Sequence, residues 1–299
     1  MRLMRIALVT TSWPAGDGDP SGHFVRAEAR ALERQGHEVR VVAPRAGGAF
    51  GWPGFAARVR QRPWRAFDAA HWVIEAHRRV ARLEVDRVVA HWAVPCAWPI
   101  AAGARSELHV VSHGGDVRLL LALSAPLRER LVRDVARRAR QWRFVSEALR
   151  NDLAAGVTRA TRDRLEAIAA VAPAAIELPD VAGAIARRRH ELAGARVAVS
   201  VGRLVRSKRV DRAIEHVARA RDVDALVVVG DGPERGRLEA HARARGVDAR
   251  FVGVVPREQA LSWIGAADHL LFASEAEGAS TVLREAEALG TRVVRLDAE

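Results

Sequence analysis

Two residue types that carry particular chemistry, cysteine and lysine, are almost absent from this sequence. The single cysteine, Cys96, cannot form an intrachain disulfide or a cysteine metal cluster, which suits a protein of the reducing cytoplasm. We expect Cys96 to be a small, buried apolar side chain. No apolar run approaches the roughly 18 residues that a membrane span needs. The run from Ile6 to Val9 is also too short for a secretory signal. These absences exclude a disulfide scaffold and predict a cytoplasmic protein without a membrane-spanning segment.

Lysine occurs once, because 47 of the 48 basic side chains are arginine and only Lys208 is not. A lysine ammonium is a compact point charge that suits a phosphate oxygen approached end-on, whereas arginine presents a planar fork. Chance survival of one lysine is an equal alternative. Lys208 is therefore a candidate phosphate ligand only in combination with its surroundings.

The positive charge is unevenly distributed along the chain. The net charge is +12, and residues 1–150 carry 25 Arg against 14 acidic residues, whereas residues 151–299 carry 23 basic against 22 acidic residues. This asymmetry favours an anionic partner for the first half, such as a phospholipid surface, an acidic glycan or a nucleic acid. A coding bias toward arginine is the alternative.

Apolar runs bounded by turn residues alternate with helical periodicity along the whole chain, which predicts α/β architecture with parallel, doubly wound sheets. The first such unit comprises a strand from Ile6 to Thr10, a helix from about Phe24 to Gln35 capped by Gly36, and a strand from His37 to Ala43. The other expected strands are Arg87 to His91, His109 to Ser112, Gln141 to Val145, Arg196 to Val201, Ala225 to Gly230, Arg250 to Val252, His269 to Phe272 and Arg292 to Leu296.

A segment from Val171 to Asp180 contains two prolines, Pro173 and Pro179, which resist helix formation and favour an extended crossing. We place the link between two domains there, with residues 1–170 in the first and residues 171–299 in the second.

The strongest chemical signal lies between Ser274 and Val294, where an expected strand leads into a helix. Gly278 permits a tight turn beside Glu277, and the free backbone N–H groups near Thr281 would attract a phosphate. Glu285, two turns into the helix, would accept hydrogen bonds from both hydroxyls of a ribose. For the spacing alone, two solvated carboxylates on an amphipathic helix are the more common explanation.

A second signal, from Gly202 to Lys208, directly follows the expected strand Arg196 to Val201. Arg203 and Lys208 flank a turn, where two cations would stabilise the charge that develops on a departing diphosphate without a metal ion. Taken singly, both are more commonly surface charges.

The segment from Gly230 to Gly236 superficially matches a dinucleotide-binding fingerprint, but its last glycine comes one position late. Pro233 at the helix start and Glu234 in its first turn already satisfy the helix dipole, and Glu234 would repel a pyrophosphate. We interpret this segment as a structural turn.

A cationic segment from Trp64 to Leu83 has the composition of a single-stranded nucleic-acid site, with Trp64 or Trp72 as stacking platforms. Its apolar stripe instead favours a helix packed on a core. The stripe comprises Ala66, Ala69, Val73, Ala76 and Val80.

Taken together, these motifs resemble the family 4 glycosyltransferases over essentially the whole chain. The matching segments occur in the order of the family: Ser12 to Val25, Gly36 to Val39, His91-Trp92, Val111 to Asp116, Val145 to Glu147, Gly202-Arg203 with Lys208, Val229 to Pro233, and Glu277 with Glu285.

The resemblance implies a GT-B fold, in which two Rossmann-like parallel-sheet domains face a cleft. Residues 1–170 would then bind the acceptor, and residues 171–299, shorter than the family's second domain, the nucleotide sugar. The reaction would retain the anomeric configuration, and the donor would be a UDP- or GDP-sugar. No cofactor, metal ligand or nucleic-acid partner is expected, and the sequence lacks an Asp-x-Asp motif.

The resemblance also implies site residues. The catalytic candidates are His113, Arg203, Lys208 and Glu277, and the donor-binding candidates are Gly22, Gly202, Arg203, Lys208, Gly278, Thr281, Val282 and Glu285. In these roles Arg203 and Lys208 hold the diphosphate, Glu285 the ribose and Glu277 the donor sugar. Gly22 lets the backbone approach the donor phosphate, and His113 lies near the reacting sugar.

The sequence departs from the family pattern in two places. Family members usually continue well beyond the helix of Glu285, whereas this chain stops at Glu299, and the loop after Glu277 reads Gly-Ala-Ser where an aromatic residue and a proline are common. We expect a transferase that acts on a glycan, glycolipid or lipid-linked acceptor, with residues 1–150 in contact with anionic membrane at its inner face. A non-catalytic nucleotide-sugar or glycan-binding module is the alternative, and nucleic-acid binding by the first half is a third.

Overall fold

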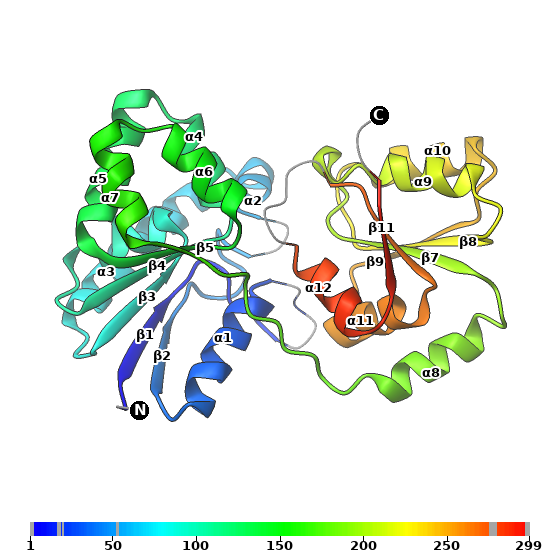
Figure 1. Ribbon diagram of the computed structural model, residues 1–299, viewed down its shortest axis with the longest axis horizontal. Helices are drawn as coiled ribbons and strands as arrows, with labels where there is room; N and C mark the ends of the chain where they lie inside the picture. The colour runs from blue at the N-terminus through cyan, green and yellow to red at the C-terminus, as the bar shows by residue number, and fades with distance from the viewer. Residues whose placement is uncertain (1–2, 17–18, 20, 52–53, 275–279, 297–299) are drawn as a thin grey trace. The chain divides into compact units, whose positions relative to one another are not determined.

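The computed structural model describes residues 3–16, 19, 21–51, 54–274 and 280–296 (Figure 1). They form two compact units, and the boundary between these units falls between Ala175 and Ile176. Each unit contains one parallel sheet with helices packed against it, as the sequence predicts for a doubly wound protein.

In the described part of the first unit, six parallel strands form one sheet. The strand Arg5–Val9 is buried on both faces, with no exposure at the neighbouring residues Ile6 and Ala7, because helices or loops cover both sides of a parallel sheet. In sheet order the strands are β2 (Glu38–Val42), β1 (Arg5–Val9), β3 (Arg87–His91), β4 (Glu107–Ser112), β5 (Ala139–Phe144) and β6 (Ala169–Val171).

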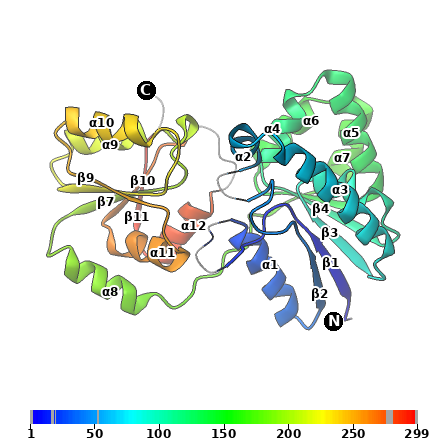
Figure 2. The same cartoon turned by 180° about the vertical axis from the view of Figure 1, so that it is seen from behind.

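The helices of the first unit follow the strands along the chain (Figures 1 and 2). Helix α1 packs Val25 and Ala29 against Ile6 and Leu8 of the sheet. The helical segments are α1 (His23–Arg34), α2 (Phe55–Gln61), α3 (Arg65–Arg82), η1 (Ala93–Ala97), η2 (Ile100–Gly103), α4 (Gly115–Ala122), α5 (Ala125–Arg138), α6 (Glu147–Ala155) and α7 (Arg159–Ile168).

The second unit contains, among its described residues, a five-stranded parallel sheet. Successive residues of a strand point to opposite faces, so Val227 packs into one core while Val228 packs into the other. In sheet order the strands are β11 (Arg292–Arg295), β10 (His269–Phe272), β7 (Val197–Val201), β8 (Ala225–Val229) and β9 (Ala249–Gly253).

Helices cover both faces of this second sheet. Helices α9 and α10 lie on one face and α8 and α11 on the other (Figures 1 and 2). The helical segments are α8 (Ala182–Glu191), η3 (Arg206–Lys208), α9 (Val210–Arg219), α10 (Arg235–Ala244), α11 (Arg257–Ala266) and α12 (Thr281–Ala288).

Every strand expected from the sequence is present, with ends that differ by at most two residues. The sequence missed β6, whose last residue, Val171, had been placed in the link. This edge strand of three residues pairs Ala169 with Trp142 and Val171 with Phe144. Two of its three residues are alanine, which has little strand propensity, so its conformation depends on the pairing with β5.

Helix α3 confirms the expected packed helix, with one exception in its first turn. Ala69, Ala76 and Val80 of the predicted stripe are buried, whereas Ala66 is exposed. The stripe therefore begins one turn later than predicted.

Candidate active site

The strand orders define one point in each sheet where successive connections change direction. In the first sheet this point lies beside β1, between β2 and β3, and in the second sheet it lies at β7, between β8 and β10. In open α/β sheets, ligands bind in the crevice beyond the carboxyl ends of the strands at such a point. Gly22 follows β1, His113 follows the neighbouring strand β4, and the candidates of the second unit follow β7 and β10.

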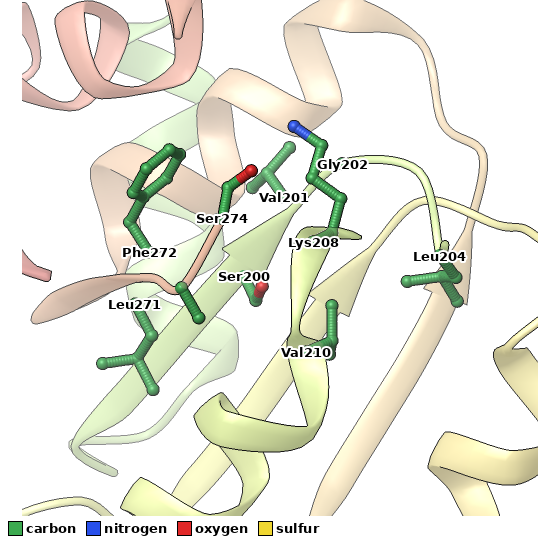
Figure 3. Close-up of a pocket in the computed structure, with 10 residues that line it drawn as sticks. Ser200, Val201, Gly202, Leu204, Lys208, Val210, Leu271, Phe272 and Ser274 are labelled. Atoms are coloured by element: carbon green, nitrogen blue, oxygen red, sulfur yellow. The ribbon is translucent and has the colours of Figure 1, made fainter. Parts of the chain in front are cut away.

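In the second unit, a small cavity of about 20 Å³ lies beyond the ends of β7 and β10. Gly202 and Lys208 line it after β7, and Phe272 and Ser274 line it after β10 (Figure 3). The Lys208 ammonium and the Ser274 hydroxyl lie at the same end of the cavity in this view. The Ser274 hydroxyl donates to the Ser207 carbonyl at 3.4 Å, which ties the two strand ends together.

The side chain of Lys208 lies over Gly202. Gly202 has a φ of +153°, and a Cβ built there would lie 3.6 Å from Cε of Lys208. The Lys208 backbone N–H donates to the Val205 carbonyl at 3.0 Å within η3. Half-buried Lys208 therefore extends over a glycine at the end of a buried strand, and its role as a phosphate ligand stays a prediction.

The turn that begins at Gly230 packs against the backbone of the segment from Gly202 to Leu204. A Cβ at Gly230 would lie 1.9 Å from the Gly202 carbonyl oxygen, and one at Gly232 would lie 2.4 Å from the Leu204 carbonyl oxygen. Both glycines are thus required by backbone packing, which agrees with the structural interpretation of this segment. The prediction that Glu234 lies in the first turn of the helix was wrong, because α10 begins at Arg235 and Glu234 is its N-cap residue. The Glu234 N–H donates to the Leu204 carbonyl at 3.0 Å.

Arg203 and Lys208 have different environments. Arg203 is exposed, and it is not among the residues that line the cavity. The structure thus places Lys208 in the cavity and Arg203 at the surface after β7, and the shared diphosphate role of the two cations stays a prediction.

Glu285 is buried on α12 and forms an ion pair with Arg257 of α11. The carboxylate oxygen Oε1 lies 2.9 Å from Nη2 of Arg257, which also donates to the Glu177 carbonyl at 2.8 Å. Burial raises the pKa of Glu285, and the neighbouring Arg257 opposes that shift. The ribose role of Glu285 stays a prediction, since this carboxylate already has a cationic partner within its own unit.

The remaining donor-binding candidates of the second unit lie around the start of α12. Thr281 is the first residue of this helix, and the side chain of Val282 packs against the core. Glu277 and Gly278 lie outside the described residues.

Gly22 precedes α1 in the first unit and has a left-handed φ of +64°. A Cβ at this position would lie 2.1 Å from the carbonyl oxygen of Ser12. The close backbone approach that requires glycine is therefore made within the loop after β1 itself. A further approach to a donor phosphate stays a prediction.

His113, directly after β4, lies against a second histidine that the sequence analysis did not select. His91 ends β3, and its Nδ1 lies 2.9 Å from Nε2 of His113. Phe24 and Trp92 contact the His113 ring, with centroid distances of 4.6 and 5.1 Å. The sequence contained a signal for this pair, because both histidines follow apolar strands whose carboxyl ends share one edge of the sheet.

A charged pair lies behind the two histidines. Glu28 of α1 pairs with Arg143 of β5, and its Oε2 lies 4.0 Å from Nε2 of His91. Burial, reinforced by the positive charge of Arg143, lowers the pKa of His91 to about 3. Burial also holds the pKa of His113 well below its usual value. Both imidazoles are therefore neutral near pH 7.

Asp116 fixes the loop that carries His113. Its carboxylate accepts hydrogen bonds from the Ser112 hydroxyl at 2.6 Å, the Ala93 N–H at 2.8 Å and the His113 N–H at 3.3 Å. Burial raises the pKa of Asp116, and the Ser112 and Ala93 hydrogen bonds oppose that shift. These bonds connect the segments that follow β3 and β4, so Asp116 orients both.

Two family descriptions match this chain, one on each unit. Residues 21–168 match Glycosyltransferase Family 4, and residues 184–299 match Glycosyl transferases group 1. A protein of Bacillus subtilis (strain 168), provisionally described as the teichuronic acid biosynthesis glycosyltransferase TuaC, is 26% identical over 346 residues. That alignment covers 98% of this chain and 81% of the relative.

Solved structures show the same fold at low sequence identity. Anabaena Alr3699/HepE, solved in complex with UDP and glucose, has a TM-score of 0.68 and 20% identity over 98% of this chain and 80% of its own. WaaG, a glycosyltransferase involved in lipopolysaccharide biosynthesis, has a TM-score of 0.57 and 19% identity over 97% of this chain and 80% of its own.

The two parallel-sheet units have the GT-B fold that these solved structures share. The chain belongs to the family 4 glycosyltransferases, as its motifs indicate and the two family matches establish.

Proposed function

We propose that this protein is a retaining, metal-independent glycosyltransferase that transfers a hexose from a nucleotide diphosphate sugar to a glycan, glycolipid or lipid-linked acceptor. The observation that carries the proposal is the position of Lys208, the only lysine of the chain, over Gly202 in the cavity beyond β7 and β10. Support also comes from HepE, which has been solved with UDP-glucose. The name of TuaC supports a polysaccharide product.

In the proposed reaction, the second unit holds the donor. Lys208, with Arg203, faces the diphosphate and stabilises the negative charge that develops as the bond between the sugar and the phosphate breaks. Glu285 binds the ribose and Glu277 the donor sugar, with further contacts from Gly202, Gly278, Thr281 and Val282. No cofactor takes part, and the donor is a UDP- or GDP-sugar.

The first unit supplies His113 beside the reacting sugar, and the loop at Gly22 completes the donor site. His113 is neutral near pH 7, because burial depresses its pKa. A neutral imidazole can accept a hydrogen bond from a sugar hydroxyl, which an imidazolium cannot do. Residues 1–150 additionally contact anionic membrane at its cytoplasmic face, where a lipid-linked acceptor resides.

Calorimetry with UDP- and GDP-sugars, followed by a transfer assay with the same donors, tests the proposal. Tight binding of one donor, with product formed by the wild type and lost in Lys208→Ala, is the expected result. Binding without product in any acceptor mixture favours a non-catalytic binding module instead. Transfer that survives Lys208→Ala unchanged places the phosphate site elsewhere.

A further inference from the structure

Helix α3 packs against the first unit through one face. The imidazole Nδ1 of His77 lies 3.0 Å from the Pro99 carbonyl oxygen, which ties the middle of the helix to the segment before η2. A Cβ at Gly103 would lie 3.1 Å from the same imidazole, so the approach is close. The buried residues of this face are Ala69, Ala76 and Val80.

The opposite face of α3 exposes large apolar side chains. Trp64, directly before the helix, and Phe67 and Ile74 within it are 53%, 79% and 52% exposed. Positions 64, 67, 71, 74 and 78 recur at steps of three and four, which places them on one side of a helix. Single exposed apolar residues are common on proteins, but three large ones along one helix face form an apolar stripe of the kind that marks an interaction site.

The same side of the helix becomes cationic toward its carboxyl end. An open hollow of about 500 Å³ is lined by three arginines and one acidic residue, together with a histidine and two apolar side chains: Arg78, Arg79, Arg82, Glu75, His71, Ile74 and Leu83. Residues 55–82 contain seven arginines against two acidic residues. A hollow that joins apolar side chains to three guanidinium groups, against the single carboxylate of Glu75, matches a ligand with a phosphate head and an apolar tail.

The composition of this face distinguishes between the possible occupants. A protein partner would be expected to meet a surface whose centre is depleted of charge, and a nucleic acid would need cations interleaved with stacking platforms along the strand. Here Trp64 and Phe67 lie at one end of the helix and Arg78, Arg79 and Arg82 at the other, and Ile74 between them offers no stacking surface. Aromatic and aliphatic side chains combined with arginine are typical of helices that lie in a bilayer interface.

We propose that the outward face of α3, formed by Trp64, Phe67, Ile74, Arg78, Arg79 and Arg82, docks on an anionic phospholipid bilayer. The three apolar side chains enter the headgroup region, and the arginines face lipid phosphates. Helix α3 itself lies on the side of the first sheet that faces the viewer in Figure 2. Among the described residues, no helix is long and apolar enough to cross a membrane. The outward face of α3 is thus the surface through which the membrane association of the proposed function would occur. This inference rests on the proposed function only for the identity of the acceptor.

Flotation of the whole protein with vesicles tests the proposal. We expect the wild type to float with phosphatidylglycerol-containing vesicles and to remain at the bottom with pure phosphatidylcholine. The variants Trp64→Ser/Phe67→Ser/Ile74→Ser and Arg78→Gln/Arg79→Gln/Arg82→Gln should each reduce the bound fraction at least about tenfold. Because the six side chains are largely exposed, circular dichroism and the melting temperature should match the wild type.

Matched control variants remove the same chemistry elsewhere in the first unit. Leu119 and Leu127 are 49% and 44% exposed, so Leu119→Ser/Leu127→Ser controls for lost apolar surface. Arg130→Gln/Arg137→Gln/Arg140→Gln controls for three lost charges. Wild-type binding by both controls supports docking through α3, whereas an equal loss in the controls shows a diffuse charge effect and overturns the proposal.

Two further outcomes also overturn it. Failure of the wild type to float with anionic vesicles excludes a bilayer partner. A dimer in ultracentrifugation that Trp64→Ser/Phe67→Ser/Ile74→Ser disrupts identifies a second copy as the occupant. Donor binding is measured in the same samples by the thermal shifts with UDP and with GDP. Flotation without a shift from either nucleotide leaves the docking surface intact and rejects the nucleotide-sugar function, so the two failures can be told apart.

Discussion

Nδ1 of His91 lies 2.9 Å from Nε2 of His113, and the two imidazole planes are only 11° apart. Since both rings are neutral near pH 7, one of these nitrogens donates its proton to the other. The Glu28 carboxylate, 4.0 Å from Nε2 of His91, favours a proton on that nitrogen. His91 then accepts at Nδ1 and His113 donates from Nε2, which leaves Nδ1 of His113 as a hydrogen-bond acceptor.

This proton arrangement is directly measurable. In ¹⁵N spectra of the histidine side chains at pH 7, both His91 and His113 should carry their proton on Nε2. His91→Gln and His113→Gln assign the two resonances. A proton on Nδ1 of His113 would mean that this side chain offers a donor, and not an acceptor, to a sugar hydroxyl.

The buried His91 predicts a loss of stability in acid. The pKa of His91 is about 3 in the folded protein, below the ordinary value of 6.5. Below pH 6.5 this histidine therefore binds a proton in the unfolded chain but stays neutral in the folded protein. The free energy of unfolding should therefore fall by up to about 1.4 kcal/mol per pH unit from this residue between pH 6.5 and about 3.

Urea unfolding of the wild type and His91→Gln at pH 7, 6 and 5 isolates that contribution. His113, Glu28 and Arg143 surround His91 and are present in both proteins, so the difference in slope reports on His91. We expect a shallower pH dependence in the variant. Parallel curves would show that His91 is protonated as easily in the folded protein as in the unfolded chain.

Replacement of Lys208 tests the phosphate site. Lys208→Ala should lower kcat/KM by about 10²- to 10³-fold, the size expected when one preorganised group that stabilises a developing anion is removed. Lys208→Arg should restore only part of the activity, because a planar fork does not reproduce a point charge. The control is Arg206→Ala, whose side chain is 90% exposed and pairs with Glu234 at 3.6 Å. Equal losses in the two alanine variants would point to a general charge effect.

The ion pair between Glu285 and Arg257 predicts a characteristic double-mutant cycle. Removal of either partner leaves a buried charge, so Glu285→Leu and Arg257→Leu should each cost about 3–5 kcal/mol, and the double variant clearly less than the sum. Urea unfolding measures all four proteins. If Glu285 also binds the ribose, Glu285→Leu should weaken UDP binding more than Arg257→Leu does. Additive costs would argue against a coupled buried pair.

The close packing at Gly22, in the loop after β1, can be tested against Gly47, which follows β2 and serves as the control. Both have a left-handed φ, +64° and +82°, but a Cβ at Gly22 would lie 2.1 Å from the Ser12 carbonyl oxygen, whereas one at Gly47 has no atom within 4 Å. Gly22→Ala should therefore destabilise the protein by about 1–3 kcal/mol more than Gly47→Ala, through overpacking. Equal melting temperatures for the two variants would show that the loop moves aside without strain.

The patterns that sequence reasoning interprets correctly are local. The run at β1 and the alternation of helix and strand predict the two parallel sheets, because a strand buried on both faces must be apolar throughout. The edge strand β6 and the exposed Ala66 were missed, since neither depends on local composition. Lys208 could be selected because the chain contains no other lysine.

The contacts that give the site its electrostatics are not local. His91 and His113 are 22 residues apart, and Glu28 and Arg143 are 115 residues apart. The same holds for Glu285, because its spacing from Glu277 in the sequence does not indicate that it pairs with Arg257. Each of these pairs forms only after sheet order has brought separate strand ends and helices together.

By itself the sequence determined the two sheets, the glycine turns and the residue types at the strand ends, because burial and backbone conformation restrict what each position can hold. Only the tertiary structure decided which charges lie together, which imidazole nitrogen is free to accept, and which face of α3 is left exposed. These properties depend on distances between distant segments and on exclusion of water, and neither is encoded in the spacing of residues along one element.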